Sequence, residues 1–147
     1  MKDHFIKPAT DFIENPNQFT IEIIKRCLRE NTIVAIYLFG SAAMNRMKPS
    51  SDFDVALLLE NGSESTFPLL QFSTDLEKIS GRRIDLVILN RSGELLQYQV
   101  RRFGKLIFER DKLKRKKFEI SGRKRYEDFI HLHNRYIKTV LYGAGHG

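Results

Sequence analysis

Two acidic side chains open an otherwise apolar segment of the sequence. Asp52 and Asp54 flank Phe53 and precede the apolar run 55–59. Because side chains alternate along a β-strand, both carboxylates are expected on the same face of that strand. Neighbouring carboxylates repel each other unless a cation neutralises them, and hard oxygen ligands of this kind suit Mg²⁺. The simpler alternative is a solvated turn followed by a pair of acids at a strand edge.

A glycine–serine pair earlier in the chain is a candidate phosphate-binding turn that would complete this metal site. Gly40 and Ser41 follow the apolar run 33–39, and a short helix is expected to start at the serine. Glycine lets the backbone approach a ligand closely, and a helix N-terminus directs free N–H groups at an anion. Phosphates held there would be bridged by metal ions on Asp52 and Asp54, the two-ion arrangement used for in-line displacement at phosphorus.

Asp85 is a third carboxylate, near the start of the apolar run 84–89. If the strands containing Asp54 and Asp85 are neighbours, all three aspartates meet at one end of a sheet. We expect Asp85 to hold the metal nearer the incoming nucleophile and to accept its proton. The alternative is a plain ion pair with Arg82 or Arg83.

The elements that must position these residues alternate between helical and strand patterns. Amphipathic spacing predicts helices, continuous apolar runs predict strands buried on both faces, and Gly and Pro mark the breaks. The expected order is helix from Thr20, strand 33–39, short helix from 42, strand 53–59, helix 65–79, strand 84–89, helix 93–103, strand 106–108, and one or two helices over 111–142. The sequence thus predicts an α/β (α+β) chain with a small mixed sheet flanked by helices and a long C-terminal helical segment. We expect one domain over residues 1–147, with an irregular lead-in at 1–18 and a mobile tail at 143–147.

Charge and composition exclude several classes of protein. The net charge of +7 is uneven, since residues 1–110 hold 15 basic and 14 acidic side chains while residues 111–147 hold 10 basic and 4 acidic. The single cysteine, Cys27, cannot form an intramolecular disulfide, and its apolar helix face predicts a buried position. No signal-peptide pattern and no apolar run of membrane-spanning length is present, so we expect a cytoplasmic protein with no membrane partner.

Gly40-Ser41, ten residues, Asp52-Phe53-Asp54 and then Asp85 together resemble the polymerase-β-type nucleotidyltransferases. The length and the pattern around Arg115, Phe118 and Glu119 are similar to the minimal nucleotidyltransferase (MNT) branch, whose members serve as antitoxins to HEPN ribonuclease toxins. The resemblance places phosphate binding on Gly40 and Ser41 and a catalytic metal triad on Asp52, Asp54 and Asp85. Where relatives often carry Arg and Gly after the serine, this chain has Ala42 and Asn45.

The resemblance implies a Mg²⁺-dependent (or Mn²⁺-dependent) adenylyltransferase that moves AMP from ATP to a tyrosine of a HEPN toxin. Two alternatives stay open: an antitoxin that neutralises its toxin by contact alone, and a nucleotidyltransferase acting on RNA or a small molecule. Nucleic acid is not the expected substrate, because only Phe118 interleaves the basic clusters of the C-terminal segment. Those clusters, 112–117 and 123–125, are expected to meet a partner or phosphate, or else to form a solvated helix face.

Two histidines of the C-terminal segment complete the sequence-based predictions. His133 falls on the apolar stripe of the segment, which predicts a packed core histidine. His131, two residues away, faces another direction, so a shared metal is not expected. Arg125 and His131 have the spacing of a HEPN nuclease motif, but that motif requires Tyr where this chain has His133. The chain is therefore expected to be the transferase of such a pair and not the nuclease.

Overall fold

A computed structural model describes residues 18–40 and 52–143 of the chain. Its helices are α1 (Gln18–Cys27), α2 (Leu69–Ser80), α3 (Glu94–Phe103) and α4 (Lys112–Ile137), with a short 3₁₀ turn η2 (Leu89–Arg91) and a π-helical continuation η3 (Lys138–Gly143). The strands are β1 (Ile33–Phe39), β2 (Phe53–Leu59), β3 (Ile84–Ile88) and β4 (Lys105–Glu109). The predicted mixed α/β architecture is confirmed. The short helix expected from residue 42 lies outside the described residues, as do nearly all of the lead-in 1–18 and the tail 143–147.

The four strands form one mixed sheet in the order β3-β2-β1-β4. β1 pairs antiparallel with β2 and β4, while β2 and β3 are parallel and joined through α2. β1 and β2 occupy the centre, which explains why their sequences are apolar almost throughout. The edge strand β3 ends at Ile88, one residue before the sequence predicted, because the chain turns into η2.

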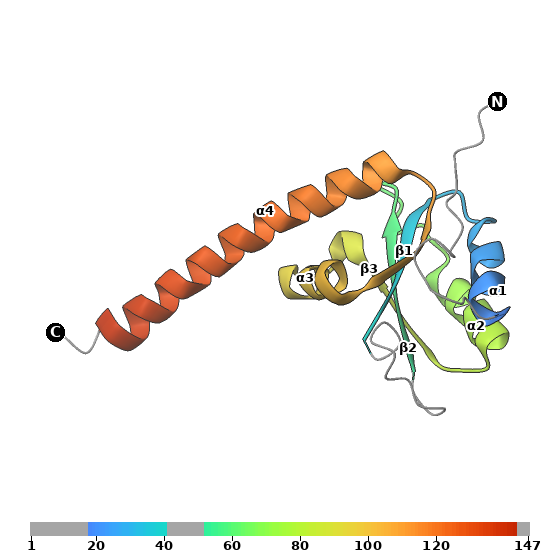
Figure 1. The fold of residues 1–147 in the computed structure, drawn as a ribbon, viewed down its shortest axis with the longest axis horizontal. Coiled ribbons are helices and arrows are strands. Elements are labelled where there is room, and N and C mark those ends of the chain that lie inside the picture. Colours follow the sequence, from blue (N-terminus) through green and yellow to red (C-terminus); the bar gives the residue numbers. More distant parts are fainter. Residues whose placement is uncertain (1–17, 41–51, 144–147) are drawn as a thin grey trace.

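Each face of the sheet is covered by its own pair of helices (Figure 1). On one face, α1 and α2 contribute Ile23, Cys27, Phe72 and Leu76 to the larger apolar core, so the predicted burial of Cys27 is confirmed. On the other face, Val100 of α3 packs with alternate residues of β1 and β2, and half-buried Phe118 of α4 lies against them. The chain thus forms three layers, with the sheet in the middle.

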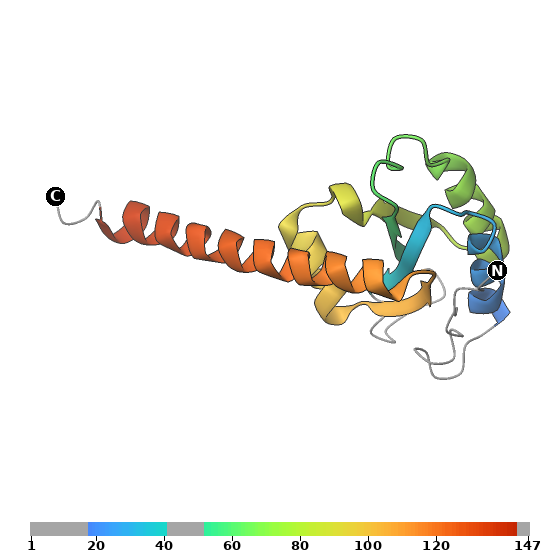
Figure 2. The same ribbon diagram turned by 90° about the horizontal axis from the view of Figure 1, so that it is seen from above.

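Helix α4 runs as one continuous helix, which decides between the two alternatives that the sequence left open. Asp111 caps its first turn, since the Asp111 side chain accepts a hydrogen bond from the Lys114 amide at 3.0 Å. The first half of α4 lies over α3 and the sheet, and the second half projects well beyond the body (Figures 1 and 2). Within the described chain, every residue from 131 to 143 is exposed except the half-buried Ile137. The apolar spacing of the C-terminal segment therefore does not mark a face packed in the chain's own core.

The expectation for His133 is wrong for the same reason. Instead of packing in a core, His133 is exposed on the projecting half of α4, where its ring stacks on Phe129 with 6.1 Å between centroids. In the part of the chain that the structure describes, no helix is both long and apolar enough to cross a bilayer.

Candidate active site

The sheet register brings together the residues singled out in the sequence. On β1, Phe39 pairs with Asp54 of β2, and Asp54 in turn pairs with Asp85 of the parallel strand β3. Gly40 follows Phe39 directly, at the end of β1. Neighbouring strands lie about 4.8 Å apart, so the acids on β2 and β3 and the glycine after β1 meet at one end of the sheet.

The carboxylates face the side of the sheet that α3 and α4 cover. Paired residues of adjacent strands point to the same face, and Phe39, the partner of Asp54, packs against the core below α3. Val87, two residues after Asp85, packs there as well. Asp54 is half-buried, whereas Asp52 and Asp85 are exposed, so the inner acid is flanked by two acids that face solvent.

The position of the Asp54 carboxylate requires a glycine at residue 40. Its φ of +68° lies in the left-handed region, and a Cβ atom at this position would come within 2.2 Å of the Asp54 Oδ2 atom. Only glycine satisfies both conditions without moving the carboxylate. This close approach places the backbone at the end of β1 directly beside the acid.

Electrostatic repulsion is concentrated on Asp54. The pKa of its carboxyl group is raised above the ordinary value by burial first, and then by the negative charges of Asp85 and Asp52. A bound cation would relieve both costs, since it replaces lost solvation and offsets the repulsion. The all-oxygen donor set fits a hard ion such as Mg²⁺.

Replacing Asp54 with asparagine should therefore stabilise the metal-free protein while removing a ligand. A carboxyl group with a raised pKa contributes stability at low pH that is lost as pH rises through the folded-state pKa. We expect Asp54→Asn to raise the Tm at pH 7.5 in EDTA, with a smaller gain at pH 4. Adding Mg²⁺ should raise the Tm of the wild type and leave that of the variant unchanged. Thermal melts at both pH values measure this, and a lower Tm for the variant in EDTA at pH 7.5 would contradict it.

Ser41 lies outside the described residues, together with Ala42 and Asn45. Among residues 18–40 and 52–143, no three His, Cys, Asp or Glu side chains enclose a single metal ion. The aspartates thus act on one another through space without converging on one point.

A cavity of about 620 Å³ lies at the opposite end of the sheet from the aspartates. Its walls include Leu59 and Glu60 at the end of β2, Asn90 of η2, and Lys114 and Arg125 of α4. Two of the basic residues that line it already have partners, because Lys114 pairs with Glu60 at 2.7 Å and Arg125 donates to the side chain of Gln97 at 3.1 Å. The cavity is therefore separate from the carboxylate site.

Comparison with known proteins identifies the family. Residues 22–113, more than half of the chain, match the family described as polymerase beta, nucleotidyltransferase. The chain belongs to this family. The matched region contains Gly40, Ser41 and all three aspartates of the site.

Two curated relatives share part of the chain. It is 32% identical over 89 residues to a spectinomycin 9-adenylyltransferase from Campylobacter jejuni, covering 53% of this chain and 34% of the relative. It is 30% identical over 83 residues to a protein adenylyltransferase MntA from Aphanizomenon flos-aquae, covering 50% of this chain and 55% of the relative. The chain thus aligns with about a third and about half of the length of these relatives.

Solved structures extend the likeness to nearly the whole length of the neighbours. A crystal structure of a toxin–antitoxin with AMP-PNP matches with a TM-score of 0.70 and 25% identity, covering 83% of this chain and 98% of that one. A complex of a tri-AMPylated Shewanella oneidensis HEPN toxin with an MNT antitoxin matches with a TM-score of 0.62 and 22% identity, covering 84% and 96%. The second match shows the fold alone.

The basic C-terminal segment contains residues whose roles the sequence did not reveal. Arg115 and Glu119 form an ion pair inside the structure, and Arg115 Nε also contacts the buried Glu109 Oε1 at 3.0 Å. Tyr37 of β1 donates its hydroxyl to Glu119 at 3.0 Å. The i, i+4 spacing of Arg115 and Glu119 on α4 is the only feature of the sequence that indicates this network. Part of the basic cluster therefore anchors α4 to the sheet and is not free to meet a ligand.

Proposed function

We propose that this chain is a Mg²⁺-dependent protein adenylyltransferase that acts as an antitoxin, transferring AMP from ATP to a tyrosine of a cognate HEPN ribonuclease toxin. The observation that carries the proposal is the pairing of Asp54 with both Phe39 and Asp85, which places two carboxylates at the end of the sheet beside Gly40 and within electrostatic reach of Asp52. Such a cluster of acids is costly without a cation and suited to one.

The relatives support the choice of reaction. Both curated relatives are named as adenylyltransferases, and the MntA relative is named as acting on protein. Among the solved neighbours, one toxin–antitoxin structure holds AMP-PNP, and its match covers 98% of that chain. These features favour ATP as the nucleotide, AMP as the transferred group and a protein as acceptor. Because the reaction consumes ATP, we place it in the cytoplasm.

In the proposed reaction, the tyrosine oxygen attacks the α-phosphorus of ATP and forms a new O–P bond. The bond between the α-phosphorus and the bridging oxygen breaks, and pyrophosphate leaves with that electron pair. Gly40 and Ser41 bind the phosphates through the backbone and the serine hydroxyl. Asp85 accepts the proton of the tyrosine hydroxyl, which its solvent-facing position at the start of β3 allows.

Asp52, Asp54 and Asp85 would hold the metal ions in this proposal. When bound, the ions supply charge neutralisation for the phosphates and stabilise the attacking and leaving oxygens. Asp54 is half-buried between two exposed acids, so its carboxylate is the donor that a bound cation would relieve most.

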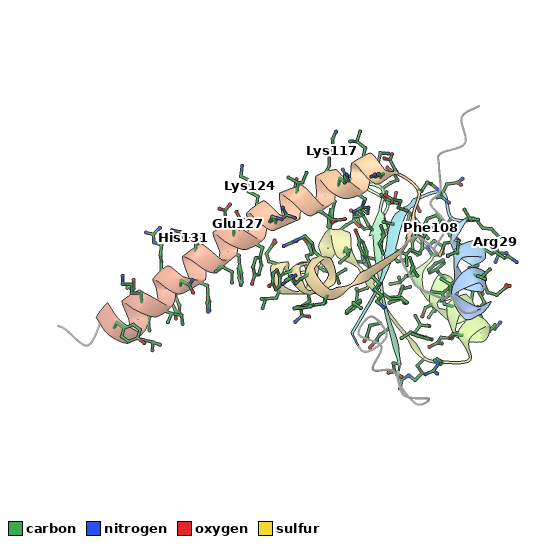
Figure 3. All side chains as sticks on the ribbon, viewed as in Figure 1. Arg29, Phe108, Lys117, Lys124, Glu127 and His131 are labelled. Carbon is green, nitrogen blue, oxygen red and sulfur yellow. The ribbon has the colours of Figure 1, made fainter. Side chains whose placement is uncertain are left out.

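The experiment combines this chain with Mg-ATP and its cognate HEPN toxin, and measures the intact mass of the HEPN protein. We expect a gain of one or more AMP units, which fragmentation places on tyrosine. The double variant Asp52→Asn, Asp54→Asn should give no adduct, a loss of at least about 10³-fold, on the scale of removing transition-state electrostatics. The matched control is Glu127→Gln, because Glu127 points away from the body on the upper side of α4 (Figure 3).

Each alternative function has its own outcome in this experiment. If the wild type gives no adduct and the double variant still neutralises the toxin, the chain acts by contact alone and the proposal fails. If AMP appears instead on RNA or on spectinomycin added to the same mixture, the chain modifies a different class of acceptor.

A further inference from the structure

An aromatic ladder joins α3 to the projecting half of α4. Tyr98 of α3 stacks on Tyr126 of α4 with 4.2 Å between centroids and 8° between planes. Phe103 meets Tyr98 edge-on at 6.5 Å, and Phe129 lies 6.5 Å from Tyr126. His133 extends the row by stacking on Phe129. The rings form a continuous surface although they come from two separate helices, which is why the sequence alone did not show it.

Beyond this ladder, the same face of α4 continues as an apolar stripe to the end of the described helix. Tyr126, Phe129, His133, Tyr136 and Val140 follow one another at intervals of three and four residues, the spacing of a seam that packs against another helix. Tyr136 is 63% exposed and Val140 is 45% exposed, so nothing in the described chain covers them. The opposite face carries Lys117, Lys124, Glu127 and His131, which point away from α3 (Figure 3).

The ladder begins close to the candidate active site and on the same side of the sheet. Phe103 is followed by Gly104 and by Lys105, which pairs with Leu38 of β1. Two strand spacings, about 10 Å, separate β4 from the strand that carries Asp54. Asp54 and Asp85 face the layer formed by α3 and α4. A protein lying along the ladder would therefore extend over the carboxylates.

The charges around this surface indicate the chemistry of the occupant. Arg101 and Arg102 flank the rings of Tyr98 and Phe103 at 5.9 and 5.7 Å, at the end of the ladder nearer the site. Residues 123–143 hold five basic and two acidic side chains, so a second copy of this chain would bring like charge against like charge. A helix with an apolar stripe and acidic residues toward its site-proximal end fits both the seam and the arginines.

We propose that the ladder and stripe, residues Tyr98, Phe103, Tyr126, Phe129, His133, Tyr136 and Val140, are the docking surface for the protein that accepts AMP. This inference rests on the proposed function, which it deepens by naming the surface that delivers the acceptor hydroxyl to Asp54 and Asp85. The partner segment is an amphipathic helix with acidic flanks, and the projecting half of α4 is the element that binds it.

The test introduces two negative charges into the stripe with Phe129→Asp, Tyr136→Asp and compares them with two on the opposite face, His131→Asp, Asn134→Asp. Binding to the cognate HEPN toxin is measured by calorimetry, and AMP transfer is measured at limiting HEPN toxin. We expect the stripe variant to raise the Kd at least about 30-fold, the scale of losing a binding hot spot, and the control to change it less than about threefold. ATP binding should be unchanged in both variants. Hydrogen exchange of the wild type should show protection over 126–142 when the partner is added.

The outcomes separate this inference from the proposed function. Wild-type affinity and transfer in the stripe variant would overturn the docking surface while leaving the adenylyltransferase intact. Tight binding without AMP transfer, lost in the stripe variant, would support the surface and overturn the transferase. Wild-type dimers that the stripe variant splits, or RNA that binds the stripe, would each overturn the assigned partner. Circular dichroism checks that α4 remains helical in both variants.

Discussion

Gly40→Ala is expected to abolish most of the proposed AMP transfer, by about 100-fold, without unfolding the protein. A Cβ atom at residue 40 would lie 2.2 Å from Asp54 Oδ2. The atom it meets is the end of a side chain, so the carboxylate rotates away and the strand pairing survives. Displacing a reacting group by about 1 Å costs on the order of 10² in rate. Steady-state AMP transfer and a thermal melt of the same preparation measure the two effects.

Gly81→Ala is the matched control for this variant. Gly81 ends α2 with the same φ of +68°, but an added Cβ atom there has no neighbour within 4 Å. Both substitutions therefore carry the strain of a left-handed alanine, about 1–2 kcal/mol, and only Gly40→Ala also displaces Asp54. We expect similar losses of Tm and a loss of transfer in Gly40→Ala alone. Equal activity in the two variants would show that Gly40 serves only the turn.

The sequence predicted the site geometry because its determinants are local. Strand β2 was predicted with its observed bounds, and the two-residue spacing of Asp52 and Asp54 determines which face they share. Gly40 could be placed because the apolar run of β1 stops there. The pairing of Asp54 with Asp85 depends on the order of the strands in the sheet. The sequence predicted that the aspartates meet only if their strands are neighbours, and the structure shows that the strands are neighbours.

The prediction for α4 was less successful because helical spacing does not say which molecule covers a face. The interval that places Phe129 beside His133 is the same for a core helix and for a helix that projects. The basic clusters are ambiguous in the same way, since Arg115 is anchored between two glutamates while Lys117 is exposed. The stack of Tyr98 on Tyr126 joins positions 28 residues apart, and no local pattern predicts it.

Arg115→Met is expected to be the most destabilising single change in the described part of α4. Glu109 is 2% exposed, and its second carboxylate oxygen, Oε2, has no hydrogen-bond partner among the described residues, so the contact with Arg115 is what compensates its charge. Removing one partner of a buried ion pair costs about 3–5 kcal/mol, which corresponds to a Tm lower by roughly 10 °C for a chain of this length. The adjacent pair of Lys114 and Glu60 is exposed, so Lys114→Met should cost about 0–1 kcal/mol. Urea unfolding of the two variants gives the comparison.

The double variant Arg115→Met, Glu109→Gln tests whether the cost comes from the stranded charge. If it does, neutralising Glu109 should recover more than half of the free energy of unfolding that Arg115→Met loses, since neither buried charge remains. Arg115 also pairs with Glu119, which accepts from the Tyr37 hydroxyl, so the part that is not recovered measures how firmly this second contact holds α4 on β1. Additive losses in the double variant would contradict the role of Glu109 and assign the stability of α4 to Glu119 and Tyr37. In either case the first turns of α4 are fixed to the sheet by buried charge. This anchorage and the stack of Tyr126 on Tyr98 hold the helix, and the turns beyond them extend into solvent.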